Sequence, residues 1–180
     1  MKVIIIGGVA GGMSTATRLR RLKEDAEITV YEMAEHVSYA NCGLPYFVSD
    51  VISKRDDLLL QTPGSLWSRF KIKVKIQSKV IAIDKVTKTV IVENLLTGEA
   101  FTDGYDKLVI STGAKPKLLE IPGIERAYSL RNVTDADRIK AAVEEIKHKS
   151  AVILGAGFIG VELAENLIHL GLAVTIVQRG

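Results

Sequence analysis

Residues 2–12 read KVIIIGGVAGG, an apolar run that ends at a glycine-rich turn. A short run with almost no polar residue is typical of a strand that a parallel sheet buries on both faces. Residues 13–22 then carry helix-forming residues, and Ile28–Tyr31 has the composition of a second strand. Strand, glycine turn, helix and strand make a βαβ crossover. The opening of the chain therefore predicts an α/β fold.

The same order recurs around Gly155–Gly160, a full GxGxxG sequence. In such a turn the first glycine permits the tight bend, the second lets a pyrophosphate approach the backbone, and the third lets the helix pack closely on the strand. The free N–H groups and partial positive charge of the helix N-terminus attract phosphate. We expect a strand at residues 151–154, a helix at 161–170, a strand at 173–177 and a second dinucleotide site.

The first turn, Gly7–Gly12, is a variant in which Val9 takes the place of the middle glycine. Gly8 and Gly11 beside it keep the loop thin. Glu32 ends the second strand, where nucleotide-binding βαβ units place an acid that holds the adenosine ribose hydroxyls. A glutamate at a strand end is otherwise a solvated residue, and the spacing behind this turn favours the binding role.

The middle of the chain predicts a sheet of another kind and a charged helix. Residues 71–76 alternate Lys with Ile or Val, the pattern of a half-exposed strand. A linker with Pro116 and Pro122 precedes an amphipathic helix. The other expected elements are an antiparallel meander at residues 80–84, 89–93 and 99–102, a buried parallel strand at Lys107–Ser111, and that helix at 135–148, capped by Thr134.

Composition excludes several classes of protein. The chain has 180 residues, 47% of them hydrophobic, and a net charge of +3, which is too small to indicate nucleic-acid binding. No apolar run reaches the roughly 20 residues that span a bilayer, and the N-terminus lacks the pattern of a signal peptide. We therefore expect a globular protein with no membrane partner. The three histidines are scattered and predict no metal site.

Cys42 is the only cysteine, and it lies in the segment SYANCGLPY, residues 38–46. One cysteine excludes a framework of internal disulfides, so a reducing cytoplasm is the expected compartment. A lone cysteine there is usually a small buried hydrophobic residue. A redox role would need a partner sulfur from outside the chain, held as a mixed disulfide or persulfide, or a sulfenic acid on Cys42 itself.

Taken together, these segments resemble the single-cysteine branch of the pyridine nucleotide-disulfide oxidoreductases, and most nearly the coenzyme A-disulfide reductases with their persulfide- and polysulfide-reducing relatives. The resemblance runs along all 180 residues. It implies a Rossmann-like three-layer FAD/NAD(P)-binding fold with an antiparallel β-meander. The segments that carry it are residues 7–12, 18–22, 38–46, 105–114, 130–132 and 155–160.

The resemblance also implies a division into domains and a longer, dimeric protein. Residues 1–115 would be a FAD-binding domain that lacks its final segment, and residues 116–148 a linker and helix. Residues 149–180 would begin an NAD(P)-binding domain that is cut short. Since the proton donors of the family come from a C-terminal domain, we expect the 180-residue chain alone to be inactive.

FAD and NADPH or NADH are the cofactors that the resemblance implies. Val80 would meet adenine through its backbone, and Glu162 would lie near the nicotinamide, although a strand valine and a helix-surface acid are ordinary alternatives. The candidate FAD residues are Gly7, Gly8, Val9, Ala10, Gly11, Gly12, Glu32, Met33, Val80, Ser111, Thr112, Gly113 and Arg131. The candidate NAD(P) residues are Gly155, Ala156, Gly157, Phe158, Ile159, Gly160, Glu162, Gln178 and Arg179.

Gln178 and Arg179 bear on the choice of reductant. An NADH site usually has an acid at this position, whereas Gln178 brings no repulsive charge and Arg179 can pair with a 2′-phosphate. We therefore expect NADPH to be accepted and preferred.

For the substrate, the resemblance implies that Cys42 is catalytic and forms a mixed disulfide with coenzyme A. Arg18 and Arg21 share a helix face and could pair with its phosphates, although a solvated basic face is the ordinary alternative. The full set of candidate substrate residues is Ser14, Arg18, Arg21, Ser38, Asn41 and Lys71, where the local match of Lys71 is loose.

The expected function is reduction of coenzyme A disulfide, or of a related persulfide or polysulfide, by NAD(P)H. Two alternatives stay open at this point. One is an NADH oxidase or peroxidase that cycles Cys42 through sulfenic acid. The other is a non-catalytic nucleotide-binding fragment.

Overall fold

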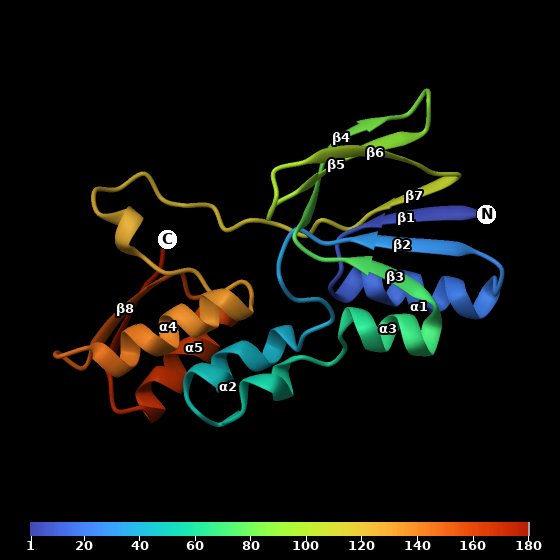
Figure 1. The fold of residues 1–180 in the computed structure, drawn as a ribbon. Helices are drawn as coiled ribbons and strands as arrows, with labels where there is room; N and C mark the ends of the chain where they lie inside the picture. The colour runs from blue at the N-terminus through green and yellow to red at the C-terminus, as the bar shows by residue number, and fades with distance from the viewer. Residues whose placement is uncertain (180) are drawn as a thin grey trace. The chain divides into compact units, whose positions relative to one another are not determined.

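The computed structural model describes residues 1–179, which form two compact units (Figure 1). The first unit comprises Met1–Tyr39 and Leu59–Ala114. The second comprises Ala40–Leu58 and the chain from Lys115 onward. The segment with Cys42 is thus packed with the second unit, and the domain boundaries expected from the sequence remain a prediction.

A four-stranded parallel sheet is the centre of the first unit. Its strand order is β3-β2-β1-β7. In register, Ile5 of β1 lies beside Val30 of β2 on one side and Val109 of β7 on the other. The strands are β1 (Lys2–Ile6), β2 (Glu27–Tyr31), β3 (Ile72–Lys75) and β7 (Lys107–Ile110).

Two helices, α1 (Ala10–Leu22) and α3 (Pro63–Phe70), pack on one face of this sheet (Figure 1). The core beneath them joins Val3 and Ile5 with Met13 of α1 and Leu66 of α3. Each fully buried aliphatic side chain contributes about 1.5–3 kcal/mol to stability. This face therefore fixes α1, and with it the glycine turn that precedes α1.

The opposite face is covered by an antiparallel sheet of β4, β5 and β6, which makes the third layer of the unit. Ile4 and Ile6 of β1 pack there against Val90 and Val92 of β5. The meander expected from the sequence is confirmed as β4 (Ser78–Asp84), β5 (Thr89–Asn94) and β6 (Ala100–Gly104), with a bulge between Val80 and Ala82.

A buried polar group anchors the end of β2 in this core. The phenol of Tyr31 donates a 2.6 Å hydrogen bond to Asp103, and Lys2 donates another of 2.5 Å to the same carboxylate. Burial, and then the hydrogen bond to Asp103, raises the pKa of Tyr31 far above its usual value. Burial alone would raise the pKa of Asp103, but the hydrogen bonds from Lys2 and Tyr31 outweigh it and lower that pKa.

Three expectations about the first unit need correction. The strand expected at residues 71–76 with the antiparallel sheet is β3 of the parallel sheet, where it pairs with β2. The strand expected at Lys107–Ser111 is parallel, but Ile110 is 63% exposed, because β7 is an edge strand among the described residues. The helix α3 was not expected at all. Its signals were a Thr62–Ser65 capping box and Pro63 in the first turn, where the missing N–H costs nothing.

In the second unit, β8 (Ser150–Leu154) and β9 (Ala173–Val177) form a two-stranded parallel sheet, with α5 (Phe158–His169) packed on it. The strand–turn–helix–strand order expected from the sequence is confirmed. Apolar side chains on these strands are open to solvent within the described residues; Val152, for example, is 65% exposed.

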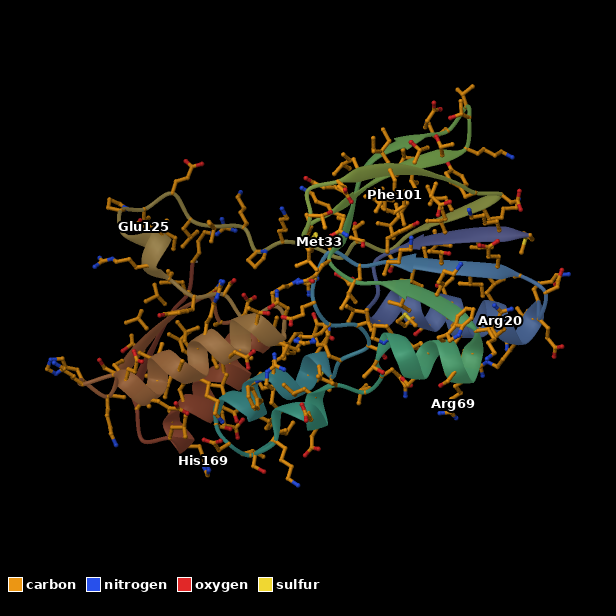
Figure 2. All side chains as sticks on the ribbon, viewed as in Figure 1. Arg20, Met33, Arg69, Phe101, Glu125 and His169 are labelled. Atoms are coloured by element: carbon orange, nitrogen blue, oxygen red, sulfur yellow. The ribbon has the colours of Figure 1, made fainter. Side chains whose placement is uncertain are left out.

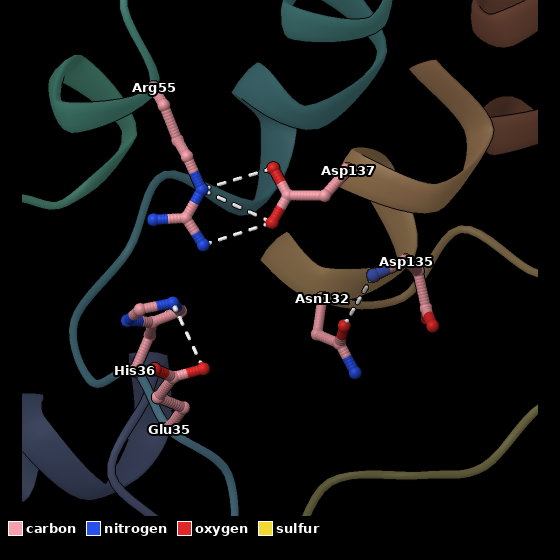
Figure 3. Close-up of polar contacts among 6 residues, drawn as sticks. All are labelled: Glu35, His36, Arg55, Asn132, Asp135 and Asp137. Atoms are coloured by element: carbon pink, nitrogen blue, oxygen red, sulfur yellow. Dashed lines mark hydrogen bonds and ion pairs between the residues drawn. The ribbon is translucent and has the colours of Figure 1, made fainter. Parts of the chain in front are cut away.

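Two further helices complete this unit: α2 (Leu44–Val48) and α4 (Val133–Glu145). The prediction that Thr134 caps α4 is wrong. Asn132, not Thr134, accepts a 2.8 Å hydrogen bond from the N–H of Asp135 (Figure 3), because the helix begins at Val133 and places Asn132 at the capping position.

Charged pairs fasten the segment Ala40–Leu58 to α4. Arg55 makes a forked contact with the carboxylate of Asp137 at 2.9–3.1 Å (Figure 3). Lys140 pairs with Asp50, donates to the carbonyl of Phe47 at 3.2 Å and lies over its ring. Forked arginine–carboxylate contacts are directional, so they fix the segment in one orientation.

Backbone pairing joins the two ends of the segment Ala40–Leu58. Tyr39 and Leu59 form an antiparallel bridge, and the N–H of Ala40 donates to the carbonyl of Leu58 at 2.8 Å. The chain therefore leaves the first unit and returns to it at neighbouring positions. Among residues 1–179, none of the helices has both the length and the apolar character needed to cross a bilayer.

Candidate functional site

The first glycine turn joins β1 to α1, and its backbone excludes side chains at two positions. Gly7 has φ +105°, and a Cβ atom there would lie 2.1 Å from the carbonyl oxygen of Ser111. A Cβ atom at Gly12 would lie 1.8 Å from the carbonyl oxygen of Gly7. Only glycine satisfies both positions, so the turn brings bare backbone to the start of α1.

The N-terminus of α1 is suited to an anion. Val9 is its N-cap and makes no side-chain capping bond, and the first turn contains no acidic residue. The first N–H groups of a helix have no partner within the helix, and the helix dipole adds positive potential. Polar groups of this kind at a glycine turn fit a pyrophosphate.

Glu32 lies directly behind the turn and is 7% exposed. One carboxylate oxygen accepts from the N–H of Gly8 at 2.7 Å, and the other accepts from the N–H of Ala34 at 2.8 Å. The two bonds hold the carboxylate in place, and each oxygen retains a second lone pair for a hydroxyl donor. The residues present therefore fit a ribose of FAD.

The structure brings some of the other expected first-unit residues to this turn. Ser38 (φ +47°) donates its N–H to the carbonyl of Gly8 at 2.9 Å, and the side chain of Ser111 lies beside Gly11. Thr112 and Gly113 follow Ser111 and are exposed. Met33 (Figure 2) is 49% exposed, and Val80 is partly buried and packs against the core beside the bulge of β4.

The second glycine turn repeats this design between β8 and α5. Gly155 has φ +107°, and a Cβ atom at Gly160 would lie 2.2 Å from its carbonyl oxygen. Gly157 is the N-cap of α5, and a Cβ atom there would meet nothing within 4 Å. Gln178 accepts a 2.8 Å hydrogen bond from the N–H of Ala156. The open side of Gly157 is the place where the turn leaves room for a ligand.

A hollow of about 560 Å³ adjoins this turn. Phe158 at its edge is 98% exposed. A volume of this size is in the range that holds a small molecule or part of a dinucleotide. The lining residues are Tyr46, Ala156, Gly157, Phe158, Val161, Glu162 and Glu165.

Tyr46 is the functional candidate that the sequence did not identify. Its phenol donates a 3.0 Å hydrogen bond to Glu162. That hydrogen bond, then the charge of Glu162, raises the pKa of Tyr46, with smaller contributions from burial, Glu165 and Cys42. Tyr46 and Glu162 are 116 residues apart, so no local pattern could have paired them.

Cys42 lies in the short 3₁₀ turn Asn41–Gly43, immediately before α2. Its thiol is exposed and free, as is expected of a cysteine that reacts with an external sulfur. Asn41 is exposed beside it. The side chain of Cys42 is therefore not buried by the part of the chain that the structure describes.

On α1, Ser14, Arg18 and Arg21 are exposed, as a substrate role requires. Arg20 (Figure 2) differs, because it donates to the carbonyls of Phe70 and Lys71 and so holds the loop after α3.

Lys71 ends α3 with φ +51° and lies over the ring of Trp67. Arg131 belongs to the second unit, where its N–H donates to Asp135 at 3.0 Å. Across residues 1–179, no group of three His, Cys, Asp or Glu side chains is placed to hold a metal.

A model of the pyridine nucleotide-disulphide oxidoreductase family matches residues 1–180. The chain belongs to this family. The coenzyme A disulfide reductase of Staphylococcus haemolyticus is 41% identical over 178 residues, which cover 99% of this chain and 40% of that protein.

Two solved structures have the same fold. Reduced CoADR-RHD of Bacillus anthracis has a TM-score of 0.95 and 48% identity, over 98% of this chain and 32% of that one. An NAD-dependent persulfide reductase from A. fulgidus has a TM-score of 0.92 and 38% identity, over 98% of this chain and 33% of that one. The chain spans about 40% of the length of the curated relative and about a third of these two structures.

Proposed function

We propose that this member of the pyridine nucleotide-disulphide oxidoreductase family is the cysteine-bearing, dinucleotide-binding part of a flavin-dependent NAD(P)H:disulfide reductase. Its substrate is coenzyme A disulfide or a coenzyme A persulfide. The observation that carries the proposal is the exposed, unbonded thiol of Cys42, the only sulfhydryl in a chain with two dinucleotide turns. The names of the similar reductases support the choice of sulfur substrate.

FAD is proposed for the first turn and NAD(P)H for the second. The backbone N–H groups at the start of α1 would receive the FAD pyrophosphate, and Glu32 would accept from the adenosine ribose. At the second turn the open side of Gly157 leaves room for a second pyrophosphate. Bound FAD supplies the transfer of two electrons from the nicotinamide to sulfur.

Cys42 would carry the sulfur chemistry. Its thiolate attacks coenzyme A disulfide, a bond forms between Sγ and one substrate sulfur, and the substrate S–S bond breaks. The first coenzyme A leaves as a thiolate and takes up a proton. Two electrons and a proton then release the second coenzyme A as a thiol and restore the Cys42 thiolate. The overall reaction consumes one NAD(P)H and one proton for each disulfide.

The exposed arginines of α1 would receive the charged end of coenzyme A. Arg18 and Arg21 lie one turn apart on the same helix face, and guanidinium groups pair well with phosphate. Ser14 is exposed on the same helix, and Ser38 and Asn41 flank the cysteine segment. At its natural length the protein is proposed to be a homodimer in a reducing cytoplasm, where Cys42 would remain a thiol.

Cys42→Ser in the protein of natural length tests the proposal. The variant should still accept hydride from NAD(P)H onto FAD but should lose turnover of coenzyme A disulfide by at least about 1,000-fold, because serine forms no mixed disulfide. Flavin bleaching and thiol release measure the two steps separately. Turnover at the normal rate would contradict the role of Cys42.

The same protein should be assayed with O2 and with hydrogen peroxide as acceptors. Faster turnover with either than with coenzyme A disulfide would replace the reductase by an oxidase or peroxidase that forms a sulfenic acid on Cys42. A protein that cannot be reconstituted with FAD would contradict the whole proposal.

A further inference from the structure

The contact between Tyr46 and Glu162 joins the cysteine helix to the second glycine turn. Tyr46 lies four residues after Cys42 in the same continuous segment, and Glu162 lies in the second turn of α5. The hydrogen bond between them forms part of the wall of the 560 Å³ hollow. A ligand in that hollow would therefore lie close to the carboxylate of Glu162.

The helices that carry this pair are fixed by a second set of hydrogen bonds. Ser49 donates to the side-chain oxygen of Asn166 at 2.5 Å, and the amide of Asn166 donates to the carbonyl of Glu162 at 2.8 Å. Ser49 and Asn166 are both buried. These bonds hold α2 against α5 without using the carboxylate of Glu162, so the bond from Tyr46 is not required to keep the helices together.

The main effect of the hydrogen bond from Tyr46 is therefore on the position of the Glu162 carboxylate. Glu162 has several rotamers on a helix surface, and a neutral phenol that donates to one oxygen selects among them. The second oxygen remains able to accept from a ligand. A carboxylate that is held in this way suits the nicotinamide end of NAD(P)H, which offers ribose hydroxyls and a carboxamide N–H as hydrogen-bond donors.

We propose that Tyr46 is a positioning residue that holds the Glu162 carboxylate at the hollow for the nicotinamide end of NAD(P)H. The inference rests on the proposed function, since it requires NAD(P)H at the second turn. It also gives the segment with Cys42 a part in binding the reductant. Tyr46 itself does not react.

Tyr46→Phe in the protein of natural length removes the phenol oxygen and leaves the ring. Because Glu162 would contact the dinucleotide equally before and during hydride transfer, the KM for NAD(P)H should rise about five- to tenfold with kcat unchanged within about twofold. The dissociation constants of NADP⁺ and NAD⁺, measured by calorimetry, should rise by the same factor. This binding measurement is independent of turnover.

Glu162→Ala and the double variant Tyr46→Phe/Glu162→Ala complete a thermodynamic cycle. If Tyr46 acts through Glu162, the phenol matters only while the carboxylate is present, and the double variant should bind as the Glu162→Ala variant does. Ser49→Ala is the matched control, because it removes a bond between the same helices but leaves the carboxylate alone. Its dissociation constants should stay within about twofold of the unchanged protein.

Additive losses in the double variant, or an unchanged dissociation constant in Tyr46→Phe, would overturn the role of Tyr46 while leaving the proposed function intact. An equal loss in Ser49→Ala would also overturn it, because the bond from Tyr46 would then serve only helix packing. Failure of the unchanged protein to bind either dinucleotide would overturn the proposed function and this inference together.

Discussion

The two glycine turns have the same backbone design but different surroundings. In each, the first glycine donates its N–H at 2.8 Å to the last residue of the second strand, Gly7 to Tyr31 and Gly155 to Val177. In each, the residue after that strand accepts from the N–H of the next residue in the turn: Glu32 from Gly8 and Gln178 from Ala156. The two turns thus share the same backbone hydrogen bonds and differ in the side chain that accepts from the turn.

The differences lie in charge and in burial. Glu32 is anionic and buried, under a turn that rests on a sheet covered on both faces. Gln178 is neutral and exposed, beside a two-stranded sheet with exposed apolar side chains. The comparison leads to two predictions: the glycines set where a dinucleotide would lie, and the residue at the strand end would set whether its adenosine ribose carries a 2′-phosphate.

Substitution of the turn glycines should produce the largest effect and tests the shared backbone. Gly12→Ala and Gly160→Ala would each place a Cβ atom within 2.2 Å of a carbonyl oxygen. Overpacking of this kind should cost about 3 kcal/mol of stability. Lower thermal unfolding midpoints for both variants would be the measurement.

Gly157→Ala is the matched control, because its Cβ atom would enter open space. It should change stability by less than about 0.5 kcal/mol but weaken NAD(P)⁺ binding, since the methyl group would stand where a pyrophosphate approaches. Normal dinucleotide affinity in this variant would show that the second turn is only structural.

Exchange of the accepting side chains should have an intermediate effect. Glu32→Gln would put an amide NH₂ opposite Gly8 or Ala34 and should cost about 1.5–3 kcal/mol of FAD affinity. Gln178→Glu would add a charge that repels a 2′-phosphate and should shift the kcat/KM ratio of NADPH to NADH by about tenfold towards NADH. A ratio that is already in favour of NADH in the unchanged protein would refute the expected NADPH preference.

The smallest effect concerns the support beneath the first turn. The folded-state pKa of Asp103 lies below its ordinary value of 3.8, so its stabilisation is complete above that value and is lost as the pH falls through the folded pKa. Asp103→Asn should remove about 1 kcal/mol at neutral pH and flatten the loss of stability below about pH 4. Urea unfolding between pH 2 and 7 would measure both. An unchanged acid profile would mean that Asp103 does not anchor Tyr31.

Local sequence patterns predicted much of this fold because the determinants are local. The bounds of β9 are those expected at residues 173–177, since Gly171 lies before the apolar run and the polar Gln178 follows it. Composition does not predict helix α3, because its segment contains Pro, Gly and Ser, which are poor helix formers, beside few apolar residues. Its capping box and N-terminal proline were the available signals.

Distant pairings could not be predicted from the sequence. The cysteine was singled out by its flanking residues, but the Tyr46–Glu162 bond and the Arg55–Asp137 pair join residues far apart in the chain. The low burial of Ile110 depends on whether another strand lies beside β7, which the sequence of β7 itself does not encode. Periodicity reports which face of an element is apolar, and not what covers it.

The antiparallel bridge between Tyr39 and Leu59 has a consequence for sequence variation. Since the segment between them starts and ends at paired backbone positions, its length and content can change without moving the strands on either side. The residues around Cys42 can therefore vary while the strands of the first unit keep their positions, as long as the contacts of the segment with α4 and α5 are retained.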